Sequence, residues 1–196
     1  MINTSIIGEI DDLTEVYAQI TDAAQEVEIL INSPGGNAFE AIQLVNAIHN
    51  SSQPVTAKVE VQAMSAAAVI ALGCDKVKID RSAIVMLHNC WTIAIGNAKD
   101  LQQEVDACKA VDFALQDIIT THCSEENAEY IKARMDDGEL WLTGVQVAEL
   151  FDNVELVEKP QKEGLKAAAG SLADLIDRYN ALVKAEKVVE PPAEEE

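Results

Sequence analysis

Ser65 has the residue type and the neighbours of a nucleophile. It stands in Gln-Ala-Met-Ser-Ala-Ala-Ala, directly after a strand-like run and at the start of an apolar helical run. Small neighbours let a substrate backbone come close, and a helix N-terminus favours negative charge that develops nearby. The same position also fits an ordinary N-cap serine. Taken by itself, this residue leaves both interpretations open.

His88 is the histidine best placed to act as a general base. It follows the apolar run Ile84–Leu87, whereas His49 and His122 stand at the ends of polar helical segments. An imidazole changes its charge near neutral pH and can therefore accept and return a proton during a reaction. A half-buried residue at a strand end is the alternative interpretation of His88.

A serine–histidine pair also needs a carboxylate that orients the imidazole. Asp136, Asp137 and Glu139 precede the run Leu140–Thr143 and provide three candidates in a loop, although most loop acids are merely solvated. Metal binding is not indicated, because the three histidines and four cysteines show no ligand spacing. No glycine-rich nucleotide loop is present. We therefore expect neither a metal nor a cofactor.

The segment Asn-Ser-Pro-Gly-Gly at 32–36 is the third candidate for chemistry. It lies between an apolar run at 27–31 and a helical pattern at 38–49. Proline fixes one backbone dihedral, and glycines adopt dihedrals closed to other residues. Such a turn can point backbone N–H groups into a cleft, where they stabilise an oxyanion. A tight strand-to-helix turn without any catalytic role is the alternative.

The charge balance excludes several classes of partner. Fourteen Lys and Arg oppose 34 Asp and Glu, which gives a net charge of −20. Nucleic acids and anionic membrane surfaces need a basic face, so we expect neither as a partner. The first basic residue is Lys58, which argues against a secretory signal or a transit peptide. The cysteines then indicate reduced thiols in a cytoplasmic protein.

The hydrophobic pattern predicts an α/β domain with a largely parallel sheet, because short strand-like runs alternate with longer helical ones. We expect one domain over residues 1–158. Residues 159–196 are predicted to hold a C-terminal amphipathic helix around 172–183 and an acidic, disordered tail. The predicted strands are 5–10, 27–31, 55–61, 76–79 and 84–87, and the predicted helices are 13–24, 38–49, 66–73, 98–121 and 125–135.

Three segments in this order resemble the signature segments of the Clp-type serine protease family (ClpP). They are Ile31–Gly36, Gln62–Ala66 and Ser82–His88. The segment Trp141–Leu150 resembles the final strand and helix of the family, and the likeness covers about residues 5–158. The stretch His88–Ala98 is closer still to the phage and prophage branch, whose members act as head-maturation proteases.

The resemblance implies a fold and a set of site residues. The fold is the ClpP/crotonase-like spiral of repeated ββα units with a protruding handle helix after residue 97. Ser65 would be the nucleophile and His88 the general base. Gly35 and Ala66 would donate the N–H groups of an oxyanion hole. The triad acid would be Glu139, where housekeeping members have Asp, with Asp137 or Asp136 as alternatives if the loop is shifted.

The same resemblance implies a function and an assembly. We expect a serine endopeptidase that forms an acyl-enzyme, cuts polypeptides, and processes phage capsid or scaffold protein. It would form a homo-oligomeric ring or double ring, heptameric as in the family. Because the first strand begins close to Met1, we expect no docking of an ATP-driven unfoldase in the usual manner. The alternatives are a crotonase-type acyl-CoA enzyme and a catalytically inactive, ring-forming assembly factor.

Overall fold

Seven strands and six α-helices alternate along the part of the chain that the computed structural model describes, residues 1–157. The predicted C-terminal helix and acidic tail lie outside the described residues. The strands are β1 (Ile2–Ile10), β2 (Val27–Gly36), β3 (Val55–Met64), β4 (Lys76–Asp80), β5 (Ile84–Leu87), β6 (Leu140–Thr143) and β7 (Val154–Val157). The helices are α1 (Thr14–Thr21), α2 (Ala38–Asn50), α3 (Ala66–Leu72), α4 (Ala98–Ile119), α5 (Glu125–Asp137) and α6 (Gly144–Leu150), with a 3₁₀ turn at Thr120–His122.

All seven strands belong to one sheet that is parallel except at one pair. Its order is β1-β2-β3-β4-β7, and β3 also pairs along its C-terminal half with β5, which in turn pairs with β6. Only β5 and β6 run antiparallel. The prediction of an α/β domain with a largely parallel sheet is thereby confirmed. The spiral arrangement and a handle role for α4 remain predictions.

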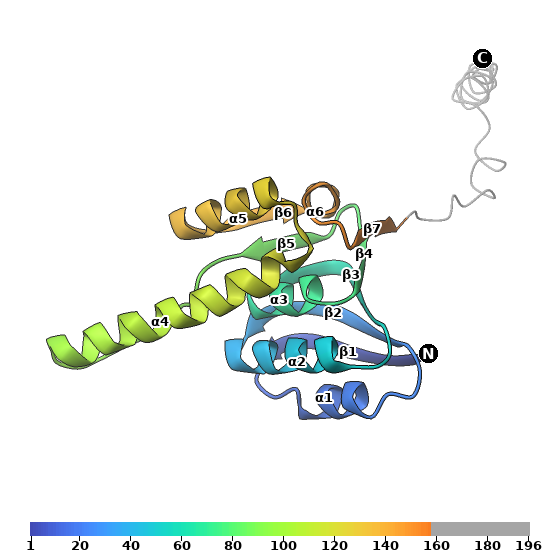
Figure 1. The fold of residues 1–196 in the computed structure, drawn as a ribbon, viewed down its shortest axis with the longest axis horizontal. Helices are drawn as coiled ribbons and strands as arrows, with labels where there is room; N and C mark the ends of the chain where they lie inside the picture. Colours follow the sequence, from blue (N-terminus) through green and yellow to red (C-terminus); the bar gives the residue numbers. More distant parts are fainter. Residues whose placement is uncertain (158–196) are drawn as a thin grey trace, which may run out of the picture. The chain divides into compact units, whose positions relative to one another are not determined.

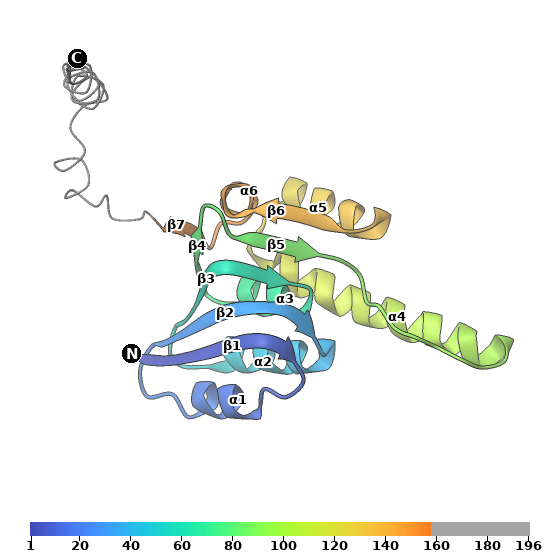
Figure 2. The same ribbon diagram turned by 180° about the vertical axis from the view of Figure 1, so that it is seen from behind.

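The helices α1, α2 and α3 lie on one face of the sheet (Figures 1 and 2). All seven residues of α3 are buried, because this short apolar helix packs between the sheet, α2 and α4. On α2, the buried positions recur at helical spacing and include Leu44, Val45 and Ile48. The core that forms between these helices and the sheet therefore fixes the start of α3.

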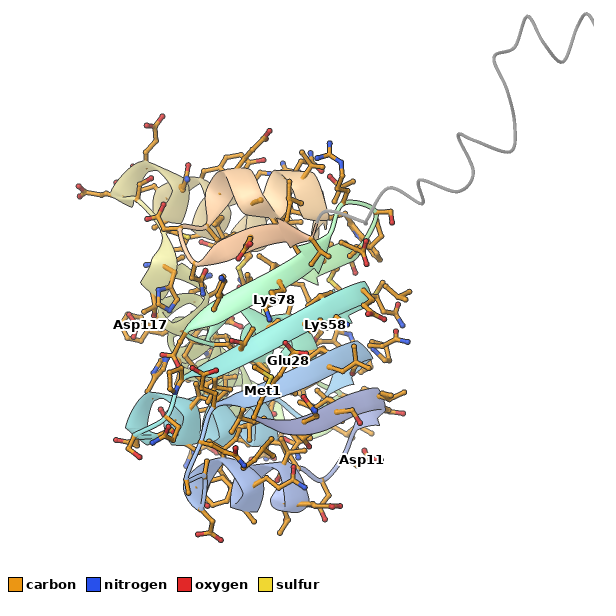
Figure 3. The ribbon with its side chains drawn as sticks, turned by 90° about the vertical axis from the view of Figure 1, so that its right-hand side faces the viewer. Met1, Asp11, Glu28, Lys58, Lys78 and Asp117 are labelled. Atoms are coloured by element: carbon orange, nitrogen blue, oxygen red, sulfur yellow. The ribbon has the colours of Figure 1, made fainter. Side chains whose placement is uncertain are left out.

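The opposite face of the sheet carries charged side chains. Parallel sheets are normally covered on both faces and have apolar strands. Here Lys78 of β4 reaches across β3 to Glu28 of β2, with 2.8 Å between Nζ and Oε2, and Lys58 of β3 pairs with Glu60. Figure 3 labels Glu28, Lys58 and Lys78 where these strands run side by side. Within the described chain, this face therefore carries ion pairs between partly exposed groups.

The segment Asn32–Gly36 is part of a strand, which differs from the predicted turn. β2 continues through it, and Gly36 pairs with Ile10 of β1. The glycines are needed because the chain keeps its pairing while it bends: Gly35 has φ 99° and Gly36 has φ 148°. The register shifts on both sides of this segment mark that bend. Asn37 then caps α2 by accepting hydrogen bonds from two backbone N–H groups.

No helix within residues 1–157 is long and apolar enough to cross a bilayer. In the same range, no group of three or more His, Cys, Asp or Glu side chains is arranged to hold a metal ion.

We predict that Gly36→Ala destabilises the protein far more than Gly138→Ala. The two glycines have nearly the same φ, 148° and 154°. A Cβ on Gly36 would lie 2.2 Å from the carbonyl oxygen of Ile10, whereas a Cβ on Gly138 would meet nothing within 4 Å. We expect Gly36→Ala to lose about 2–4 kcal/mol more in the free energy of unfolding, measured by urea denaturation. Equal losses would show that backbone strain, and not the close approach to β1, decides both.

Candidate active site

Ser65 occupies the junction between β3 and α3 in a strained conformation. Its φ is 52° and its ψ is −126°, and it is the only residue other than glycine with a positive φ in the described chain. Although it holds the N-cap position of α3, its side chain makes no capping hydrogen bond. Its own backbone N–H instead donates to the carbonyl oxygen of Met86 on β5. The hydroxyl is thus turned away from the helix.

The hydroxyl of Ser65 meets the imidazole of His88. Ser65 Oγ lies 2.7 Å from His88 Nε2, which is within hydrogen-bond distance. The two residues are brought together because β3 and β5 are adjacent and parallel, with Met64 opposite Met86. Both strands therefore end at the same edge of the sheet, where β3 leads into α3 and β5 leads into a loop. Of the two interpretations of Ser65, the geometry disfavours the ordinary capping serine, because its hydroxyl makes no capping hydrogen bond.

The backbone of Gly35 lies directly against Ser65. A Cβ on Gly35 would stand 2.7 Å from Ser65 Cβ and 3.1 Å from the amide nitrogen of Ala66. Ala66 opens α3, so its N–H is one of the first-turn groups that have no acceptor within the helix. The N–H of Gly35, in contrast, donates to Oγ of the buried Ser33 at 3.0 Å. The structure brings Gly35 and Ala66 together beside Ser65, and the N–H of Gly35 is bonded to Ser33.

The ladder between β5 and β6 ends one residue short of His88 and Glu139. The antiparallel pairs run from Ile84 with Thr143 to Leu87 with Leu140. His88 directly follows the last paired residue of β5, and Glu139 directly precedes the first paired residue of β6. Leu87 and Leu140, the last pair of the ladder, are buried, and the adjoining His88 and Glu139 line one cavity.

Each of the three candidate acids contacts a group other than His88. Glu139 Oε2 accepts a hydrogen bond from the indole N–H of Trp141 at 2.9 Å. Asp137 lies 3.6 Å from a guanidinium nitrogen of Arg134. Asp136 Oδ1 accepts from the side-chain amides of two residues absent from the sequence-based prediction, as described below. All three acids are exposed.

Two cavities meet at His88. A cavity of about 510 Å³ is lined by Ser65 and His88 together with apolar side chains that include Trp91, Val111 and Leu115. A second, of about 300 Å³, is lined by His88 and by residues 135–139, which include the three acids. The prediction of a loop is wrong for Asp136 and Asp137, because α5 continues to Asp137. His88 thus borders one cavity together with Ser65 and another together with the acidic segment 136–139. A cavity of about 660 Å³ between α1 and α2 has no histidine, cysteine or carboxylate in its wall.

A match to a family model decides which kind of protein has this site. The model is that of the Clp protease, and it matches residues 9–151. The chain belongs to the Clp protease family. Its members form oligomeric rings and act on polypeptide substrates. No curated protein matches the chain. Family membership supports a ClpP-type peptidase in general, and it gives no support to an acyl-CoA enzyme.

Two residues near the candidate site, Gln116 and Asn89, were not identified as site residues from the sequence. Gln116 of α4 donates from Nε2 to Asn89 Oδ1 and to Asp136 Oδ1, each at 3.0 Å. Asn89 also donates from Nδ2 to Asp136 Oδ1 at 2.9 Å. Side-chain amides of this kind belong to no sequence motif, so only their hydrogen bonds to each other and to Asp136 identify them. The one available signal was that Asn89 directly follows the candidate base.

The cysteines carry no disulfide in the described chain, which covers all four. Cys90 and Cys108 approach to 3.8 Å between their sulfur atoms. Burial, followed by the contact with Cys108, raises the pKa of the Cys90 thiol to about 11. Burial likewise raises the pKa of Cys123 to about 11. Because thiols with such pKa values are almost wholly protonated at neutral pH, neither is a ready nucleophile.

We predict that Ser65→Gly is more stable than Ser65→Ala. Alanine keeps the Cβ that makes φ 52° costly, whereas glycine adopts this conformation freely. The relief exceeds the extra chain entropy of glycine, so we expect a difference of about 1 kcal/mol in the free energy of unfolding.

Ser82 provides the matched control, because it is exposed and its φ is not positive. At this position the order should reverse, with Ser82→Ala more stable than Ser82→Gly. If Ser65→Gly is no more stable than Ser65→Ala in denaturant titrations, the strain assigned to the β3–α3 junction is wrong.

Proposed function

We propose that this chain is a serine endopeptidase of the ClpP type with Ser65 as nucleophile and His88 as general base. The observation that carries the proposal is the 2.7 Å approach of Ser65 Oγ to His88 Nε2 by a serine that forgoes its capping bond. A strained serine at a strand-to-helix junction exposes its hydroxyl to a substrate, and the adjacent base activates it.

The reaction follows from these atoms. Ser65 Oγ attacks the carbonyl carbon of the peptide bond while its proton passes to His88 Nε2. The tetrahedral intermediate collapses when His88 gives that proton to the leaving amine, and an ester to Ser65 remains. Water then attacks the ester, again losing a proton to His88. The proton returns to Ser65 Oγ as the new carboxylic acid leaves.

Glu139 is our choice for the acid that orients His88. It is supported by the position of Glu139 directly before β6, whose partner strand β5 leads into His88, and by the cavity that both residues line. Glutamate stands where other members have Asp, and its longer side chain can still reach the imidazole. Its bond to the exposed indole of Trp141 must be exchanged for one to His88. Asp137 remains the alternative, because its Arg134 partner at 3.6 Å is a weak surface contact.

The oxyanion hole is proposed at Gly35 and Ala66. Both amides border Ser65, and α3 adds the favourable N-terminal end of its peptide dipoles. The N–H of Gly35 becomes available to a substrate when the hydroxyl of Ser33 turns away. The Ser33 side chain can rotate in this way, because its hydrogen bond to Gly35 joins two neutral groups and is modest in strength.

We further propose a heptameric ring or double ring in the cytoplasm. The charged face of the parallel sheet lacks a covering layer within the described chain (Figure 3). Large apolar side chains are also exposed on α4 and on the loop before it, among them Phe113, Ile93 and Ile95. Surfaces of both kinds are suited to contacts between copies of the chain. Processing of phage capsid or scaffold protein is proposed from the resemblance of residues 88–98 alone.

One specific observation favours the second candidate, an inactive ring-forming assembly factor. In the described chain, no carboxylate accepts a hydrogen bond from His88, and the N–H of Gly35 is engaged by Ser33. A protein that had lost catalysis would keep these contacts permanently. The protease and the assembly factor therefore differ in whether Ser65 reacts.

We predict that a fluorophosphonate labels the wild-type protein at Ser65 and that Ser65→Ala abolishes both labelling and peptide hydrolysis. The probe requires an activated serine hydroxyl, which only the pair with His88 supplies. Mass spectrometry of the labelled peptide locates the adduct. Ser82→Ala is the control and should label at the wild-type rate. Absence of labelling in the wild type would favour the assembly factor.

We predict that Glu139→Gln lowers the labelling rate more than Asp137→Asn does. A carboxylate that orients the imidazole and stabilises its charged form contributes several powers of ten in serine proteases, up to about 10⁴. An acid that is only solvated contributes almost nothing. A larger loss in Asp137→Asn than in Glu139→Gln would transfer the role of triad acid to Asp137.

A further inference from the structure

Three side chains on one stripe of α4 hold the segment that directly follows His88. Cys108, Asp112 and Gln116 are spaced by four residues and therefore face the same way. Cys108 lies against the thiol of Cys90, Asp112 accepts the backbone N–H of Cys90, and Gln116 donates to Asn89. A helix outside the catalytic segments thus contacts the two residues that follow the candidate base.

Gln116 differs from the other two because it also contacts Asp136 in the last turn of α5. Its Nε2 donates to both Asn89 Oδ1 and Asp136 Oδ1, and Asn89 Nδ2 donates to that same carboxylate oxygen. The three side chains close a triangle of hydrogen bonds, each 2.9–3.0 Å long. One corner is adjacent to His88, and another lies three residues before Glu139.

The triangle spans the gap that β5 and β6 leave open. The ladder between these strands ends at Leu87 and Leu140, one step short of His88 and Glu139. Beyond that pair, the ladder does not continue in the described chain. The distance between the base and its candidate acid therefore depends on side chains, and the bridge through Gln116 joins both segments to α4.

We propose that Gln116 is a positioning residue that fixes the C-terminal end of α5, and with it the acidic segment 136–139, relative to His88 by bridging Asn89 and Asp136. The proposal rests on the proposed function for its catalytic meaning, since it assigns Gln116 a role in the geometry of that site. Gln116 itself lines neither of the two cavities at His88 and acts through its two partners. The bond from its amide to Asn89 is partly buried, whereas the bonds of Gln116 and Asn89 to Asp136 are exposed.

The test compares Gln116→Ala with Gln103→Ala, a matched change at an exposed position of the same helix. The first readout is the rate of fluorophosphonate labelling. We expect Gln116→Ala to react roughly 10- to 100-fold more slowly, which is the scale of a misplaced catalytic group, and Gln103→Ala to match the wild type. Gln116→Asn, which keeps the amide but withdraws it by one methylene group, should fall between them. It also replaces Gln116→Ala if that variant does not fold.

The second readout requires no activity. The chain has three histidines, so ¹³C-histidine NMR resolves His88 against His49 and His122. We expect Gln116→Ala to move or broaden the His88 ring signal alone, whereas loss of helix stability would not single out that ring. A His88 signal identical to the wild type overturns the inference, whatever the labelling rate. A wild type that does not label contradicts the proposed function instead, and the NMR comparison still decides on Gln116.

Discussion

The conformation of Ser65 is the constraint on which the rest of the site depends. An L residue adopts φ 52° and ψ −126° only where its surroundings enforce it. Here the enforcement comes from both sides. The N–H of Ser65 is tied to β5, and all of α3 is buried behind it. The junction cannot relax without breaking a strand contact or exposing a core helix, and so the hydroxyl stays directed at His88.

The close approach of β2 to this junction is the second part of that constraint. Gly35 leaves room for Ser65 because any side chain at that position would collide with it. Gly36 does the same for the carbonyl of Ile10 on β1. The bend of β2 therefore lets three neighbouring strands converge at one edge of the sheet. A glycine pair that looks like an ordinary turn is what allows two backbone amides to border the serine.

The acidic side of the site is less firmly determined than the serine side. Ser65 and His88 follow paired strands, whereas Asp136 and Asp137 form the exposed C-terminal end of α5 and Glu139 lies in the exposed segment between α5 and β6. Each acid has a competing partner, and the competing bonds are surface contacts that cost little to exchange. The serine and the histidine are thus held more firmly than the carboxylates. The hydrogen bonds of Gln116 and Asn89 limit how far the carboxylates adjust.

The sequence by itself determined the alternation of strands and helices, because apolar periodicity reports directly on which face of each element is buried. It also singled out Ser65 and His88, since their residue types and the ends of apolar runs carry information that is local in the chain. It mistook residues 32–36 for a turn, because the glycines permit a bent strand and a turn equally well. Only the tertiary structure decided that the Ser65 hydroxyl forgoes capping, that Glu139 and His88 line one cavity, and that Gln116 joins the two segments. Those facts depend on strand register and on contacts between residues distant in sequence, which no local pattern encodes.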